Sequence, residues 1–140
     1  MITISQFGNV PAALTGNANK TIAIVNEIFA AMPNRFRFTS GYRTPAQNAA
    51  ANGVENSFHV KALAADFVPV DGKFTAAEKA SIVSIISKYG YELITHNVGS
   101  GLHYHIEPAN SAAAANLPAI GGVSAVAVLA GIVLLILITE

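Results

Sequence analysis

Cysteine is absent from this chain of 140 residues, and charged residues are scarce. The lack of cysteine excludes disulfides, thiolate metal sites and a cysteine nucleophile. Charged residues make up 11% of the sequence, against about 25% in ordinary soluble domains, and 52% of the residues are hydrophobic. Disorder is excluded because disordered chains are polar or highly charged. The net charge is zero and lysine and arginine form no cluster, so no nucleic acid is expected as a partner.

Charged residues are scarce mainly in the C-terminal part of the chain. All eight basic residues and seven of the eight acidic ones lie between Lys20 and Glu107. Residues 109–118 are mostly small or neutral and are interpreted as a linker. Residues 119–138 are apolar apart from one serine, and at about 1.5 Å each they reach about 30 Å, the thickness of a bilayer's hydrocarbon core. We therefore predict a head over residues 1–108 and a transmembrane helix over 119–138.

This helix predicts a single-pass membrane protein with a C-terminal anchor, whose residues 119–138 contact the lipid bilayer. The N-terminus shows no pattern of a secretory signal peptide. No lysine or arginine flanks the span, so the positive-inside rule assigns no orientation. Ala127 and Gly131 form a weak small-xxx-small pair, which leaves a homo- or hetero-oligomer through the membrane helix open.

The head shows both helical and strand patterns. Apolar spacing, capping residues and stop signals predict helices, and alternating or short apolar runs predict strands. The expected helices cover residues 21–32, 44–52 and 75–89, and the expected strands cover 35–39, 64–68, 91–95 and 102–106. His96 falls in an expected loop after the third strand, and no role is assigned to it.

Two histidines and a carboxylate share one face of the last expected strand. Because side chains alternate across a strand, His103, His105 and Glu107 point to one side while their neighbours pack on the other. The pattern fits a solvent-exposed face of an edge strand, and it also fits a functional site. The residues alone leave both interpretations open.

Asp66 lies among apolar residues in another expected strand. An unpaired carboxylate is costly to bury, so Asp66 needs a cation, a metal or several N–H groups. His59 precedes it by seven residues, in a loop that can fold back on the strand. Together with His103 or His105, these residues would form a His₂Asp set, which leaves the fourth position of a zinc ion to water.

Four short motifs occur in an order and spacing that resembles the zinc D-Ala-D-Ala carboxypeptidases and the phage L-alanyl-D-glutamate endopeptidases. They are SGYRTP at 40–45, NSFH at 56–59, AADF at 64–67 and HYH at 103–105. The same group contains lysostaphin and the Hedgehog signalling domain. The resemblance covers about residues 18–108 and implies an α+β fold, in which a small antiparallel sheet is flanked by helices. It also implies one Zn²⁺ per chain.

The resemblance assigns roles to six residues. His59, Asp66 and His105 would be the zinc ligands, and His103 would lie near the metal-bound water. Arg43 and Ser57 would bind the substrate, Arg43 by contacting a carboxylate or carbonyl and Ser57 from its place beside the first ligand.

The chain departs from the family at the expected general base. Many members carry an acidic residue three positions before the last ligand, where this chain has Leu102. The base would then be His103, or Glu107 if its face turns inward, or the enzyme would be impaired. The implied reaction is metal-assisted amide hydrolysis, with Arg43 or protonated His103 near the oxyanion.

We predict a membrane-anchored zinc metallopeptidase that hydrolyses peptide bonds in the stem peptides of bacterial peptidoglycan, as a DD-carboxypeptidase or an endopeptidase. An endolysin-like enzyme of the bacterial envelope, or a phage-encoded one associated with the internal membrane of a virion, fits this prediction. The alternative is a non-catalytic zinc-binding module, or a structural membrane protein of a virion that retains the fold.

Overall fold

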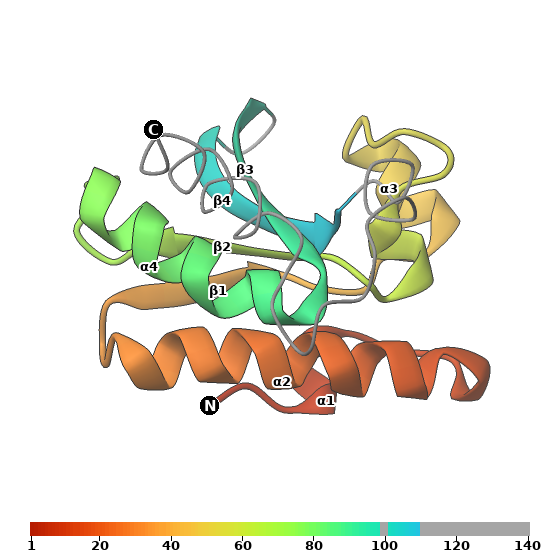
Figure 1. Cartoon of the computed structure of the whole chain (residues 1–140). Coiled ribbons are helices and arrows are strands. Elements are labelled where there is room, and N and C mark those ends of the chain that lie inside the picture. The colour runs from red at the N-terminus through yellow and green to blue at the C-terminus, as the bar shows by residue number, and fades with distance from the viewer. Residues whose placement is uncertain (99–100, 110–140) are drawn as a thin grey trace, which may run out of the picture.

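The computed structural model describes residues 1–98 and 101–109, which form a four-stranded antiparallel sheet with helices packed on it (Figure 1). The strand order is β1-β2-β4-β3. This arrangement confirms the predicted α+β head with a small antiparallel sheet. In chain order the elements are α1 (Ile4–Phe7), η1 (Ala12–Leu14), α2 (Thr15–Ala31), β1 (Phe36–Ser40), α3 (Pro45–Ala50), η2 (Phe58–Lys61), β2 (Ala65–Pro69), α4 (Ala76–Ile86), η3 (Ser87–Tyr89), β3 (Tyr91–Val98) and β4 (Gly101–Pro108).

The predicted transmembrane helix at 119–138 lies outside the described residues, as does the predicted linker after its first residue. Among the residues that the structure does describe, no helix is both long and apolar enough to cross a membrane. The backbone N–H of Ala109 donates to the carbonyl of Gly90 over 2.9 Å. The head therefore includes the first residue of the predicted linker.

Helix starts follow local capping signals. In α3 the hydroxyl of Thr44 accepts from the backbone N–H of Gln47, and the Gln47 side chain accepts from the N–H of Thr44. Thr75 and Glu78 form the same reciprocal pair at the start of α4. Each pair satisfies two N–H groups that have no partner inside the helix, which is why the sequence predicts these starts closely.

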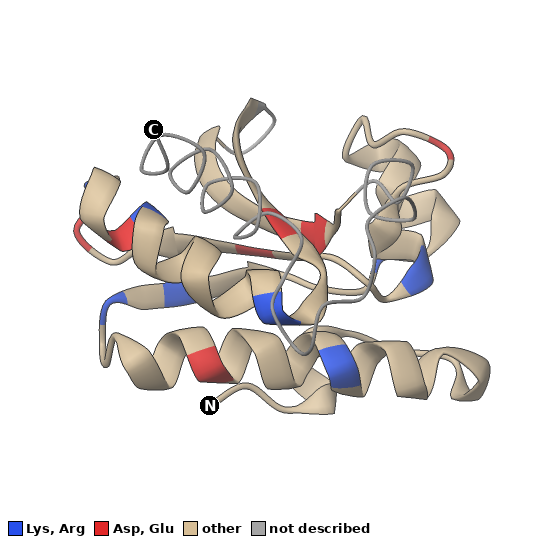
Figure 2. Ribbon diagram, in the orientation of Figure 1, with Lys and Arg blue, Asp and Glu red and all other residues tan. Residues whose placement is uncertain are grey.

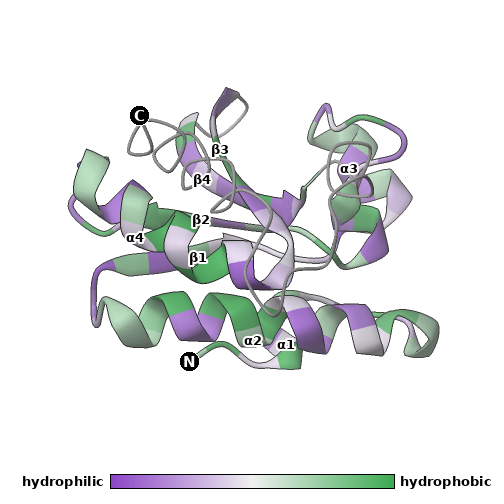
Figure 3. Ribbon diagram, viewed as in Figure 1, coloured by the Kyte–Doolittle hydropathy of each residue, from purple (hydrophilic) through white to green (hydrophobic). Residues whose placement is uncertain are grey.

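One face of the sheet carries the hydrophobic core. α2 and α4 run beside each other against it, while α3 lies apart from them (Figure 1). Hydrophobic residues recur along both helices and the strands they cover (Figure 3). Full burial of each such side chain stabilises the fold by about 1.5–3 kcal/mol. The core contains Ile24, Val25 and Ile28 of α2, Ile82 and Ile86 of α4, and Phe36, Phe67, Tyr104 and Ile106 of the sheet.

Charged residues lie on several elements of the head (Figure 2). Some of them link separate elements by ion pairs. Arg35, before β1, bonds to Asp71 after β2 and to Glu78 in α4, and Lys88 in η3 bonds to Glu27 in α2. The contacts of Arg35 join the ends of β1 and β2 to α4, and the contact of Lys88 joins η3 to α2.

The strand register places the polar residues on the face opposite the core. Phe67 pairs with Tyr104 and points to the helices, so the next pair, Asp66 and His105, points the other way. β4 lies between β2 and β3, which rules out the interpretation of the HYH motif as the face of an edge strand. β3 also extends three residues beyond its expected end, so the loop predicted at His96 was wrong. The hairpin pairing with β4 supplies the hydrogen bonds that extend it.

Candidate metal centre

Asp66 lies at the centre of a polar cluster and is 3% exposed. Its Oδ1 is 2.7 Å from Nδ1 of His105, and its Oδ2 is 3.2 Å from Nε2 of His59. Nη2 of Arg43 donates to Oδ2 over 2.6 Å. Burial works against the charged carboxylate, but the hydrogen bonds to His105 and His59 outweigh it and hold the pKa of Asp66 well below its ordinary range. The partners that the burial of Asp66 requires are therefore His59, His105 and Arg43.

His59 is presented by the short helix η2. The hydroxyl of Ser57 caps this helix by accepting from the backbone N–H of His59 over 3.3 Å. Nδ1 of His59 lies 2.6 Å from the carbonyl of Gly41. A carbonyl can only accept, so Nδ1 carries a hydrogen, and Nε2 is the ring nitrogen that faces Asp66.

Gly41 is needed where it stands because the N-terminal segment packs against it. A Cβ at this position would lie 2.5 Å from the backbone carbonyl oxygen of Phe7, closer than a side-chain carbon can approach. The next residue, Tyr42, donates its N–H to that carbonyl over 2.8 Å. The glycine of the SGYR motif thus lets the chain pass close enough to place its own carbonyl at His59.

His105 reaches the cluster from β4, directly opposite Asp66 in the register. Its Nε2 lies 2.8 Å from Oε2 of Glu107, on the side away from Asp66. Burial disfavours the charged ring, but the hydrogen bonds to Asp66 and Glu107 prevail and raise the pKa of His105. In the absence of a metal, both ring nitrogens are thus positioned to donate to carboxylates.

His59, Asp66 and His105 form a group that fits a metal ion. One donor atom from each lies within 4.8 Å of the others, and all three residues are buried. Two imidazole nitrogens and one carboxylate oxygen are ligands that zinc prefers, and three protein ligands leave a coordination position open. The hydrogen bond of His59 to Gly41 supports this fit, because it engages Nδ1 and leaves Nε2, which faces the group, as the nitrogen that a metal would bind.

His103 lies at the edge of this group rather than inside it. Its Nε2 is 3.9 Å from Oδ1 of Asp66, and its Nδ1 is 2.8 Å from the carbonyl of Gly101. The carbonyl requires a hydrogen on Nδ1, so Nε2 is the ring nitrogen on the side of Asp66.

His96 is a site residue that the sequence did not indicate. It pairs with His103 across β3 and β4, and its ring stacks on that of His105 with centroids 4.8 Å apart and planes 12° apart. Burial, together with the nearby charge of His105 and His103, lowers the pKa of His96. The only sequence signal that could have indicated His96 was the alternation of side chains along the expected strand 91–95, had it been extended by one residue.

Leu102 does not take part in the cluster. It precedes His103 in β4, so its side chain points to the opposite side of the strand, where it is 43% exposed. An acidic side chain at this position of this chain would point away from Asp66. Position 102, where many family members carry the acidic base, therefore cannot supply a general base to the metal-binding group of this chain.

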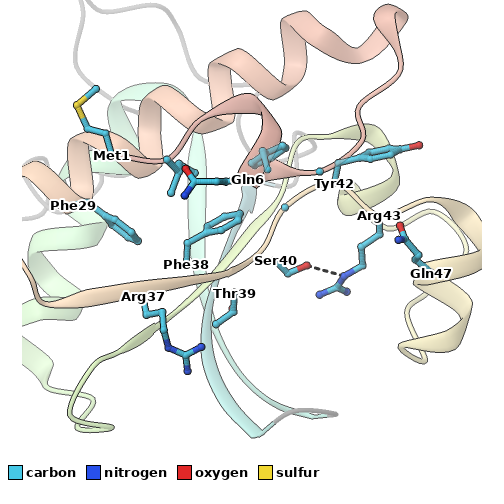
Figure 4. Close-up of a pocket in the computed structure, with 14 residues that line it drawn as sticks. Met1, Gln6, Phe29, Arg37, Phe38, Thr39, Ser40, Tyr42, Arg43 and Gln47 are labelled. Carbon is cyan, nitrogen blue, oxygen red and sulfur yellow. Dashed lines mark hydrogen bonds between the residues drawn. The ribbon is translucent and has the colours of Figure 1, made fainter.

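Arg43 lies between two cavities. Its Nε donates to Oγ of Ser40 over 2.9 Å, which holds the guanidinium at the end of β1 (Figure 4). The groove in Figure 4 follows β1, and among the described residues that line it none carries an imidazole or a carboxylate. The other cavity opens above the metal-binding group, with a volume of about 810 Å³. This volume lies within the range of about 300–1,000 Å³ that is typical of ligand sites.

The second cavity brings together all the predicted site residues. Its walls come from the segment between α3 and η2, from the end of β3 and from β4. The charged, imidazole and hydroxyl side chains that line it are Arg43, Ser57, His59, Asp66, Thr95, His96, His103, His105 and Glu107, and the amides are Asn52, Asn56 and Asn97.

A buried His₂Asp group beneath a cavity, on the sheet face opposite α2 and α4, fits a single zinc ion with one coordination position left open, as in zinc hydrolases. Residues 4–99 match the model of the family Peptidase M15. The chain belongs to this family, whose members are zinc-dependent peptidases resembling D-Ala-D-Ala carboxypeptidases. The match includes His59 and Asp66 and ends before His105, so the third donor rests on the geometry. No curated protein matches the chain.

Proposed function

We propose that the protein is a membrane-anchored zinc peptidase that hydrolyses a peptide bond in the stem peptides of bacterial peptidoglycan, as a DD-carboxypeptidase or an endopeptidase. The observation that carries the proposal is the convergence of His59, Asp66 and His105 at the base of a cavity large enough for a peptide. Membership of the M15 family supports the zinc peptidase chemistry and the peptidoglycan substrate.

His59, Asp66 and His105 would hold the zinc ion, which supplies a Lewis acid that acidifies water and polarises the scissile carbonyl. Arg43 would bind a carboxylate or carbonyl oxygen of the substrate, because its guanidinium lines the cavity and donates at its edge. His103 would carry a proton between reacting groups at its Nε2, since Nδ1 is engaged by a backbone carbonyl.

The cellular setting forms the other part of the proposal. Residues 119–138 would anchor the chain in a bilayer, and the short segment after Ala109 would keep the head within a few tens of ångströms of it. An envelope of a bacterium and the internal membrane of a phage are both settings in which an anchored enzyme reaches peptidoglycan. Contacts between membrane helices would allow an oligomer.

One feature favours a second candidate, a zinc-binding module without activity. The position where many family members carry an acidic base holds Leu102, and the carboxylates that line the cavity are Asp66, a member of the metal-binding group, and Glu107, which is bonded to His105. Such a protein would bind zinc and would use the site for stability or for a partner.

The test uses the full chain purified in mild detergent. Metal analysis should find about one zinc per chain, and digestion of purified peptidoglycan of several chemotypes should release new amines or stem-peptide fragments, detected by mass spectrometry. His103→Ala should lower the rate by about 10²–10⁴-fold and retain the zinc, because the residue lies outside the ligand group. Lys73→Gln, at an exposed position between β2 and α4 that lines neither cavity, serves as the control and should leave the rate unchanged.

Absence of zinc from the wild type would contradict both candidates. Bound zinc without any release from the peptidoglycans would refute the enzyme and leave the zinc-binding module. A His103→Ala variant that retains the full rate would refute the role given to His103.

A further inference from the structure

His105 is held by carboxylates at both of its ring nitrogens. Nδ1 lies 2.7 Å from Oδ1 of Asp66, and Nε2 lies 2.8 Å from Oε2 of Glu107. Asp66 also contacts Nε2 of His59, so the remaining donors of the metal-binding group lie on the Nδ1 side of the ring. The Nε2 side of His105 is turned toward Glu107 instead.

We propose that Glu107 is a positioning residue of the metal centre. It accepts a hydrogen bond from Nε2–H of His105 and thereby fixes both the ring orientation and the tautomer, so that Nδ1 is presented to the zinc ion. This inference rests on the proposed zinc site and deepens it. It removes Glu107 from the candidates for the general base.

The chemistry of metal-bound imidazole supports this role. A histidine that binds a metal through one nitrogen commonly donates its other N–H to a carboxylate or a carbonyl, which sets the tautomer. His59 shows the carbonyl version, because its Nδ1 donates to Gly41. Glu107 follows His105 by two residues in β4 and so points to the same face, within reach of Nε2. The two ligand histidines are thus held in complementary ways, one by a carbonyl and one by a carboxylate.

The ring of His105 is also fixed across its plane. His96 stacks on it nearly parallel, at 12°, and His59 lies at 5.1 Å with a tilt of 59°. These contacts restrict movement of the ring out of its plane but do not select its tautomer. The hydrogen bond to Glu107 supplies that selection.

The position of Glu107 also carries an electrostatic cost. Its direct partner in the β3–β4 register is Glu92, and like charges directly opposite each other destabilise a strand pair. The N–H of His105 offsets this repulsion at Glu107. The pair also provides a matched control, since Glu92 places the same charge on the same sheet face, whereas Glu107 is the one that accepts the hydrogen bond from His105.

The experiment measures the zinc affinity of the full chain in mild detergent, by competition with a chelator. Glu107→Ala should bind zinc about 10–100-fold more weakly than the wild type, the usual effect of removing such a partner. Glu107→Gln keeps an oxygen that can accept from Nε2–H and should recover most of the affinity. Glu92→Ala should match the wild type. Near-UV circular dichroism of each variant establishes that the fold is retained.

Nitrogen-15 NMR of histidine in the zinc-loaded wild type gives a readout that does not depend on a variant. We expect the hydrogen of His105 on Nε2 and the metal on Nδ1, and zinc on Nε2 would overturn the inference. Equal losses of affinity in Glu107→Ala and Glu107→Gln would instead make Glu107 a ligand. Wild-type affinity in Glu107→Ala, or an equal loss in Glu92→Ala, would overturn the inference while the zinc site stands. A wild type that binds no zinc would refute the proposed function itself.

Discussion

Tyr104 links the strand that carries His103 and His105 to the helices on the other side of the sheet. Its side chain is fully buried, and its hydroxyl donates to Oε1 of Glu78 in α4 over 2.5 Å. Glu78 in turn accepts from Nε of Arg35 over 2.6 Å. Replacement of Tyr104 by phenylalanine keeps the ring in the core and removes only the hydroxyl.

The expected loss of stability in Tyr104→Phe depends on the hydrogen-bond partners that Glu78 keeps. Glu78 keeps its bonds to Arg35 and to the backbone N–H of Thr75, so the variant leaves no unpaired buried charge. The cost is then that of one hydrogen bond to a charged group, about 1.5–3 kcal/mol of the free energy of unfolding. A domain of about 100 residues loses about 4–8 °C in Tm for each kcal/mol.

The assay is thermal unfolding of the metal-free full chain in mild detergent, followed by near-UV circular dichroism. Tyr89→Phe is a matched control, because the hydroxyl of Tyr89 also donates to a glutamate, Glu27, but the residue is 37% exposed. Its effect should stay within about 0.5 kcal/mol, as for other surface changes. Equal shifts in Tm for Tyr104→Phe and Tyr89→Phe would refute the reasoning that burial gives the Tyr104 bond its value.

Three further predictions concern metal, ring packing and pH. Zinc at about 100 times its Kd should raise the free energy of unfolding by about 2.7 kcal/mol, measured as a Tm shift that a chelator reverses, and Asp66→Ala should abolish the increment. His96→Ala should cost the metal-free protein about 0.5–1.5 kcal/mol by loss of the stack on His105, and His96→Phe should restore it, as thermal unfolding would show. The pKa of Glu78 is lowered, because hydrogen bonds from Arg35 and a buried tyrosine outweigh the effect of burial. Its stabilising contribution is therefore present above the ordinary range of a glutamate and is lost as pH falls below about 4.5, and unfolding of Glu78→Gln should depend less on pH there.

The local elements were predictable because their signals are contained in a few neighbouring residues. Thr44 and Thr75 cap helices through bonds to residues three positions on, which the sequence displays directly. α2 was predicted to begin at Thr21 but begins at Thr15. The side-chain amide of Asn17 donates to the carbonyl of Lys61 and Ala18 is fully buried, so the first turns of this helix are held by contacts with distant segments.

The sequence by itself determined which donors were available and which of them share a face. Without cysteine, a zinc site must use histidine and carboxylate, and strand alternation places His103, His105 and Glu107 on one side. From the residues alone both His103 and His105 were candidates, and only the family resemblance indicated His105. The tertiary structure sets His105 opposite Asp66 in the register and stacks His96 on it. The reason is that the register between strands is fixed by hydrogen bonds and core packing across the whole sheet, and a shift of one residue would turn every side chain to the other face.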